Sequence, residues 1–281
     1  KGYALWTPVM EAALENVIAG KDVPTRPKTE PAVAKEQLKK KKNHKLIGQI
    51  IAGILAFVLL FSSLCGIAGY IYCANMFGYD APGNAKEYWL ENVTPHTSSP
   101  LEGKVILGVG SSVMAGWSAR TVGPGEYLCK LNNATYIREC ATGTSVTTKP
   151  DGTSLDNQGT YLPRLMKHTA EENVDIVILQ IGTNDTADWV EVGVNEPGVS
   201  LNLADYNEYT YCGAMQSMIA YSISTWGTDT KVVIYSNSRF TSKDVEKYQS
   251  MVDQTKEIID KWQEAGFGVY LMDMWSDAEF N

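Results

Sequence analysis

The pattern of apolar and polar positions divides the chain into three parts. Residues 46–77 contain no charged side chain and read LIGQIIAGILAFVLLFSSLCGIAGYIYCANMF. Because about 20 apolar residues can cross a bilayer, this run predicts one transmembrane helix. The alternatives are a buried core helix, which is seldom so long and so uniformly apolar, and a secretory signal peptide, which lies at the N-terminus with a shorter apolar region.

After residue 103, short apolar runs alternate with segments of helical periodicity. The run DIVILQI at 175–181 is continuously apolar up to its glutamine, which is typical of strands in a parallel sheet. The pattern predicts five strands, at 104–110, 135–139, 175–181, 231–236 and 268–274, and helices within 116–132, 160–173, 204–225 and 242–266. This alternation predicts an α/β fold with a doubly wound parallel five-stranded sheet, a flavodoxin-like three-layer sandwich with helices on both faces.

We therefore divide the chain into four segments. Residues 1–45 form a tail with a short amphipathic helix at 2–20 and a basic linker, and residues 46–77 form the transmembrane helix. Residues 78–103 form a polar connector, and residues 104–281 form the α/β domain.

The distribution of charge predicts the orientation in the membrane. The sequence KKKKNHK at 39–45 directly precedes the apolar run, and residues 1–45 carry 10 Lys or Arg against 5 Asp or Glu. Residues 78–281 carry 14 Lys or Arg against 27 Asp or Glu. The positive-inside rule then predicts a single-pass protein of the cell membrane, with its N-terminus in the cytoplasm and the α/β domain outside the cell. An acidic domain also argues against a nucleic-acid partner, which needs clustered cations.

Small and polar residues follow the first three predicted strands. GVGSSVMAG at 108–116 has no lysine where a phosphate-binding P-loop needs one, and Val113 stands where a dinucleotide-binding loop has its third glycine. A turn that presents a serine nucleophile is the remaining chemical interpretation. Gly143 and Asn184 follow the second and third strands. Because the carboxyl ends of parallel strands meet at one edge of the sheet, we expect these residues to lie near the serine loop.

In these blocks the sequence resembles the SGNH (GDSL-like) hydrolase family over residues 103–281. Residues 110–116 align with the family's Gly-Asp-Ser block, although Ser111 replaces the aspartate, and residues 182–185 match the Gly-x-Asn-Asp block without a mismatch. The resemblance implies that Ser112 is the nucleophile. It also implies that the Ser112 N–H, the Gly143 N–H and the Asn184 side chain stabilise the oxyanion, with no metal and no organic cofactor.

The family's general base has no counterpart in the sequence. The family has an Asp-x-x-His block after its last strand, but neither Asp273 nor Asp277 is followed by histidine three positions later. His44, His96 and His168 lie elsewhere in the sequence. Because a serine hydroxyl is a poor nucleophile without a base, residues 1–281 are expected to be nearly inactive. We expect the block to follow Asn281, and the alternative is a protein without a base.

The cysteines and the segment 186–212 can each be interpreted in two ways. The sequence has five cysteines but no zinc-ligand spacing, and Cys129 and Cys140 could form a disulfide or remain thiols. The acidic, aromatic segment 186–212 could be a substrate lid or a variable surface loop. In the first case Trp117, Trp189 and Tyr206 could stack on sugar rings.

The sequence thus predicts a membrane-anchored cell-surface serine ester hydrolase. Its expected substrates are small acyl esters, such as O-acetyl groups on carbohydrates. One alternative is an O-acyltransferase that acylates a cell-wall polymer through the same serine. The other is an inactive hydrolase-like module that binds a glycan or a protein.

Overall fold

The computed structural model describes residue 19 and residues 30–78, 81–149, 159–241 and 244–279. The chain forms two compact units, Lys1–Gly69 and Tyr70–Asn281, which are treated separately below. The amphipathic helix expected at 2–20 lies, apart from residue 19, outside the described residues.

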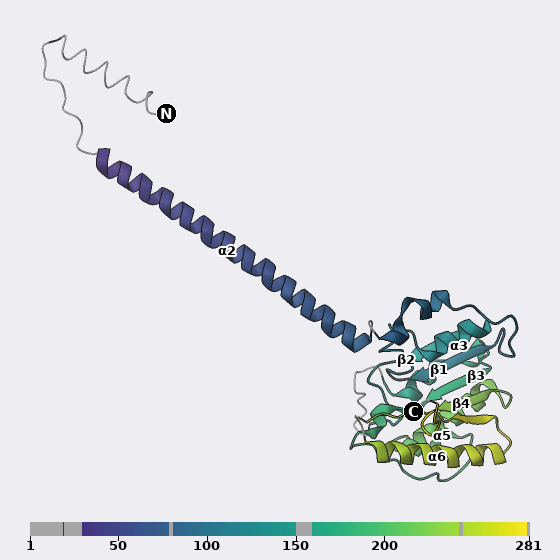
Figure 1. Ribbon diagram of the computed structural model, residues 1–281. Coiled ribbons are helices and arrows are strands. Elements are labelled where there is room, and N and C mark those ends of the chain that lie inside the picture. Colours follow the sequence, from purple (N-terminus) through teal and green to yellow (C-terminus); the bar gives the residue numbers. More distant parts are fainter. Residues whose placement is uncertain (1–18, 20–29, 79–80, 150–158, 242–243, 280–281) are drawn as a thin grey trace. The chain divides into compact units, whose positions relative to one another are not determined.

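Helix α2, Glu30–Phe77, contains the apolar run (Figure 1). It begins well before the predicted residue 46, because the lysine-rich segment continues the helix and Pro31 lies in its first turn, where proline is tolerated. Large apolar side chains from Leu46 to Tyr72 are exposed along it. Over Lys39–Met76 the helix is long and apolar enough to cross a membrane.

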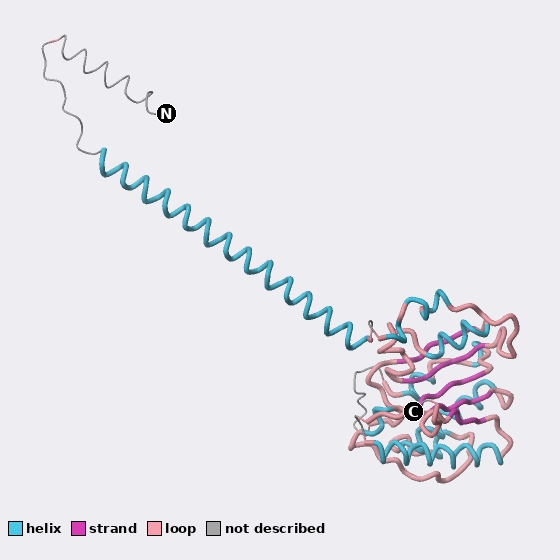
Figure 2. The backbone as a smooth tube through the Cα atoms, viewed as in Figure 1, coloured by secondary structure: helices cyan, strands magenta, loops and turns pink. Residues whose placement is uncertain are grey.

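The second unit is built on a five-stranded parallel sheet, as the sequence predicted (Figures 1 and 2). The strands lie in the order β2-β1-β3-β4-β5, so β1 and β3 are neighbours at the centre. The chain leaves β1 towards β2 and then returns past β1 to β3, which makes this central pair the topological switch point. The strands are β1 Val105–Gly110, β2 Thr135–Cys140, β3 Ile176–Gln180, β4 Lys231–Tyr235 and β5 Val269–Met272.

Four helices connect these strands: α3 Pro124–Asn132, α4 Tyr161–Leu165, α5 Tyr211–Trp226 and α6 Val245–Glu264. Right-handed crossovers place α3 on one face of the sheet and α4, α5 and α6 on the other, because the strand order proceeds in opposite directions from β1. The main core lies on the second face. There Leu107, Leu179 and Ile234 pack with the three helices around the fully buried Trp262.

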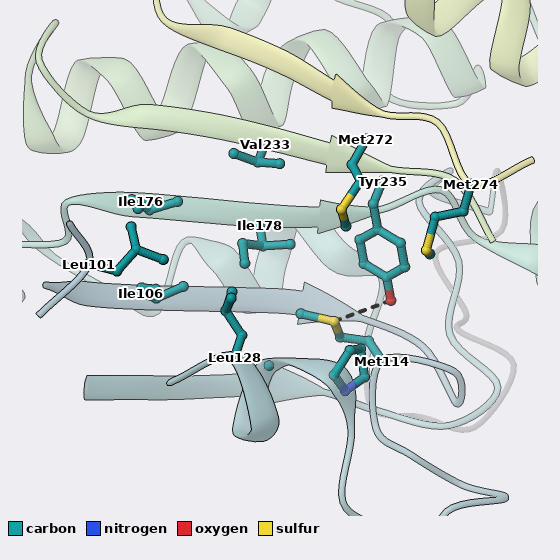
Figure 3. Close-up of a pocket in the computed structure, with 12 residues that line it drawn as sticks. Leu101, Ile106, Met114, Leu128, Ile176, Ile178, Val233, Tyr235, Met272 and Met274 are labelled. Carbon is teal, nitrogen blue, oxygen red and sulfur yellow. Dashed lines mark hydrogen bonds between the residues drawn. The ribbon is translucent and has the colours of Figure 1, made fainter. Parts of the chain in front are cut away.

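The opposite face is only partly covered by the described residues. Helix α3 packs over β1 through Cys129, and beyond it an apolar groove of about 370 Å³ lies along β3 and β4. Figure 3 shows the groove running along the strands from Leu101 to Met114, Tyr235 and Met274 near the strand ends. The Tyr235 hydroxyl lies 3.2 Å from the Met114 sulfur.

Two predicted helices are shorter than expected. The segment 160–173 forms only the five residues of α4 and then a 3-10 turn at Ala170–Glu172, which ends at Asn173 in a left-handed conformation. The helix expected from residue 204 begins at Tyr211, because the Thr210 hydroxyl accepts the Gly213 N–H and caps the first turn.

The cysteines of the second unit that the structure describes are free thiols. Cys129 is buried under α3, and the Cys140 thiol donates to the Gly108 carbonyl at 3.4 Å. Burial raises the pKa of each of these two thiols to about 11. The sequence allowed a disulfide or two thiols, and the structure has two thiols. With these raised pKa values, Cys129 and Cys140 are poor nucleophiles at neutral pH.

Candidate active site

Two consecutive serines follow β1 and lie in different environments. Ser111 is fully buried, and its backbone N–H donates to the Gln180 Oε1 atom at 2.8 Å. Ser112 is partly exposed and begins a tight turn in which its carbonyl accepts the Trp117 N–H at 2.9 Å. Among the residues that the structure describes, the hydroxyl and the backbone N–H of Ser112 have no hydrogen-bond partner. Only Ser112 is therefore available to a substrate.

Gln180, at the end of β3, fixes the position of the serine loop. Its Oε1 atom also accepts the Met114 N–H at 3.3 Å, and its Nε2 atom donates to Asn237 Oδ1 at 2.9 Å. Asn237 follows β4 and donates to the Ile181 carbonyl at 3.0 Å. One buried amide thus connects the ends of β1, β3 and β4. Its sequence signal was a polar residue at the end of an otherwise apolar strand.

Gly143 lies in the turn after β2, with a φ of 82° that favours glycine. The buried Arg164 positions this turn against β1, because its Nη2 atom donates to the Gly110 carbonyl at 3.1 Å and to the Thr144 hydroxyl at 3.0 Å. Ala141 N–H also donates to the Gly110 carbonyl at 3.0 Å. Within the described part of the chain, the Gly143 N–H has no acceptor and is free to donate.

Asn184 lies in a 3-10 turn, Thr183–Thr186, directly after β3. Its side chain is partly exposed, and its Nδ2 atom donates to the Thr144 carbonyl at 2.9 Å. An amide nitrogen carries two hydrogens, so one holds the Gly143 turn and the other can donate to a ligand. The structure thus brings the loops of Ser112, Gly143 and Asn184 together through Gly110 and Thr144 at one edge of the sheet.

Asp185 holds the other side of the same turn. Its fully buried carboxyl accepts the Val146 N–H at 2.9 Å and the Thr147 N–H at 2.8 Å. Burial raises the pKa of this carboxyl from 3.8 to about 6, although both N–H donors and the nearby Lys247 act to lower it. Asp185 therefore stabilises the Gly143 turn at the cost of a buried charge.

This buried carboxyl gives a pH dependence of stability. Between about pH 4 and pH 6 the folded protein keeps the proton on Asp185 while the unfolded chain releases it. The contribution of Asp185 to the free energy of unfolding therefore falls by about 3 kcal/mol as the pH rises through this range. Urea unfolding of the full chain at about pH 4.5 and about pH 7 measures it. The variant Asp185→Asn should lack this part of the pH dependence. The same pH dependence in both proteins would contradict the assignment.

Neither His96 nor His168, the histidines of the second unit, lies near Ser112. The backbone N–H of His96 donates to Leu131 at the end of α3, and His168 precedes β3, so both lie toward the opposite edge of the sheet. The His168 ring lies 2.9 Å from the Glu172 carboxylate. His44 belongs to α2, in the other unit.

At the end of β5, Asp273 lies at the same edge as the serine loop. Its carboxylate pairs with Lys256 at 2.8 Å and accepts from Ser236 and the Ser276 N–H. Partial burial acts to raise its pKa, but the hydrogen bonds from Lys256 and Ser276 outweigh this effect and lower the pKa to about 2. Asp273 is therefore a stable anion within an ion pair.

The segment 186–212 packs along helices α5 and α6. The Lys261 ammonium, near the end of α6, donates to the Asn195 carbonyl at 2.9 Å, and Ser224, late in α5, donates to the Leu201 carbonyl. Tyr206 is buried, and its hydroxyl donates within the segment to Gly198. Because both helices end at the opposite edge of the sheet, the middle of the segment is remote from the serine loop, and Tyr206 is not available for stacking on a sugar.

No protein-family model matches the sequence, and no curated protein matches it. Solved structures are similar to it at low identity. A family two carbohydrate esterase from Clostridium thermocellum is 13% identical over 64% of this chain and 56% of that chain, with a TM-score of 0.39. A protein named as a GDSL-like lipase, from Bacteroides uniformis, is 16% identical over 59% and 82%, with a TM-score of 0.41. A carbohydrate acetylesterase from Sinorhizobium meliloti is 15% identical over 60% and 83%, with a TM-score of 0.40.

Proposed function

We propose that the α/β domain is a serine ester hydrolase that acts on small acyl esters, such as O-acetyl groups on carbohydrates. The observation that carries this proposal is the position of Ser112. The residue is partly exposed, its hydroxyl and backbone N–H are unpaired within the described residues, and hydrogen bonds hold the Gly143 and Asn184 loops beside it.

In the proposed reaction the Ser112 Oγ attacks the ester carbonyl carbon and gives its proton to a base. The negative charge on the carbonyl oxygen is stabilised by N–H donors from Ser112, Gly143 and Asn184. The alcohol leaves with a proton, and water then hydrolyses the acyl-serine to release the acid. No step needs a metal or an organic cofactor.

The reaction needs a base, and neither His96 nor His168, the histidines of the second unit, lies near Ser112. In the family that the sequence resembles, this base is a histidine in an Asp-x-x-His block after the last strand. The positions of His96 and His168 favour a second candidate, an inactive hydrolase-like module that keeps the serine loop and binds a glycan or a protein.

We also propose that helix α2 anchors the protein in the cell membrane, with the lysine-rich residues 39–45 in the cytoplasm and the α/β domain outside the cell. The support is the exposed apolar surface of α2 and the charge difference between its two flanks.

The test incubates the protein translated from the complete gene with 4-nitrophenyl acetate and with acetylated xylan, in the presence of a free xylo-oligosaccharide. We expect free acetate, and a fluorophosphonate reagent should form an adduct on Ser112 that mass spectrometry locates. Acetate appearing on the oligosaccharide instead would identify an acyltransferase. If no acetate is released or transferred and no adduct forms, the enzyme proposal is overturned in favour of the binding module.

A further inference from the structure

A second cavity, of about 280 Å³, lies between the connector and the loop that follows Ser112. Trp89, Asn84 and Glu91 line it from the connector, Arg120 lines it from the loop, and Tyr127 lines it from α3. The loop begins close to Ser112 in the chain, and its Trp117 N–H donates to the Ser112 carbonyl. The cavity therefore borders the loop that follows Ser112 and is lined by none of the proposed catalytic groups.

Hydrogen bonds hold the walls of this cavity in place. The Asn84 amide donates to the Ser118 carbonyl at 2.8 Å, which joins the connector to the loop. The Trp89 indole N–H donates to the Asn84 carbonyl at 3.0 Å, and the Tyr127 hydroxyl donates to the Tyr88 carbonyl at 2.7 Å. The two aromatic rings are thus fixed before any ligand arrives, which lowers the entropic cost of binding.

The loop wall of the cavity has a strained backbone. Arg120 and Thr121 have φ values of 58° and 63°, a left-handed conformation that a β-branched threonine rarely adopts. Such residues cost about 1–3 kcal/mol each and concentrate at functional sites. Here Arg138 donates to the Thr121 carbonyl at 3.1 Å and supports the conformation. The Arg120 guanidinium lies over one face of the Trp89 ring, 4.2 Å from its centroid.

The lining indicates the chemical class of the ligand. Arg120 donates hydrogen bonds, the Glu91 carboxylate accepts them, and Trp89 and Tyr127 offer aromatic surface. Among the described lining residues Arg120 and Glu91 carry opposite charges, which disfavours a ligand with a net charge, and charged walls disfavour an alkyl chain. A pyranose ring meets both demands, because it has apolar C–H faces and hydroxyls that donate and accept. The volume is just below the range of about 300–1,000 Å³ typical of small-molecule pockets.

We propose that this cavity is a carbohydrate-binding subsite that holds a neutral sugar ring of a polymer next to the Ser112 loop. The connector that follows helix α2, residues 78–103, then has a binding role within the second unit. This proposal does not require Ser112 to be catalytic, so its failure and that of the proposed function are distinguishable. It also assigns sugar stacking to Trp89 and Tyr127, in place of the buried Tyr206.

The test titrates the full chain with xylohexaose and with cellohexaose, in a detergent without a sugar head group, by calorimetry and tryptophan fluorescence. We expect saturable binding to one of them and a loss of at least about tenfold in affinity for Trp89→Ala. Tyr270→Ala, which removes an exposed aromatic ring on β5, is the matched control and should bind normally.

A milder pair of variants covers the case in which Trp89→Ala fails to fold. Trp89→Phe keeps a ring for stacking and should retain more affinity than Glu91→Gln, which keeps the shape but loses the charged acceptor. If the wild-type chain binds neither xylohexaose nor cellohexaose, the proposal is overturned. Binding that is insensitive to Trp89 and to Glu91 would also overturn it.

Discussion

Replacing Ser112 by alanine is expected to lower kcat for acetyl-ester hydrolysis by about 10³- to 10⁶-fold in the protein translated from the complete gene. The reason is that the proposed nucleophile Ser112 is partly exposed beside the Gly143 and Asn184 loops, so its loss removes the acyl-serine route. Initial rates with 4-nitrophenyl acetate measure the effect. A matching loss of the fluorophosphonate adduct would show that the same atom is involved.

The neighbouring serine provides the control. Ser111→Ala removes a buried hydroxyl whose contact with Gln180 is long, at 3.3 Å, and keeps the backbone N–H bond to the same atom. This variant should therefore keep most of the activity. If Ser111→Ala were inactive and Ser112→Ala active, the nucleophile would have been assigned to the wrong serine.

Replacing Asn184 by alanine is expected to lower kcat by about 10²- to 10³-fold with little change in KM. A donor to the developing oxyanion acts mainly in the transition state, so its loss affects kcat more than substrate binding. Asn184→Asp should be at least as damaging, because a carboxylate of the same size cannot donate. Stopped-flow or steady-state kinetics with the acetyl ester separate the two parameters.

Asn184 also holds the Thr144 carbonyl, so a structural explanation needs its own control. Thr144→Val removes the hydroxyl that accepts from Arg164 and donates to the Ala141 carbonyl. This variant therefore loosens the same turn but keeps the Asn184 side-chain amide. If Thr144→Val lowered kcat as much as Asn184→Ala does, the effect of Asn184 would come from positioning the turn.

The periodicity of the sequence was sufficient to predict the sheet. Apolar runs such as 175–181 mark strands buried on both faces, and the five observed strands lie within one or two residues of the predicted ones. Helix ends were predicted less well, because they depend on single residues. Thr210 caps α5 six residues after the start of the apolar pattern, and α4 stops where the chain turns toward β3.

The candidate site was predicted only in part, for a physical reason. Ser112, Gly143 and Asn184 follow three strands, and a parallel sheet brings the ends of its strands to one edge whatever the intervening sequence. Gln180 and Arg164 make contacts across 69 and 54 positions of the chain, respectively, which local pattern does not encode. The cavity at Trp89 depends on how the connector folds back against α3, and no periodicity indicates that.

The apolar groove beside Met114 affects how the proposed esterase activity should be compared between esters of different acyl length. The lining of this groove is apolar and includes Met272 and Met274. Alkyl chains therefore bind there through the hydrophobic effect. Nitrophenyl esters with long acyl groups will partition into it, and so will detergent tails, which will compete with them. An apparent KM that falls with acyl length will then report partitioning into the groove. Acetyl and propionyl esters, compared at several detergent concentrations, report the serine site itself.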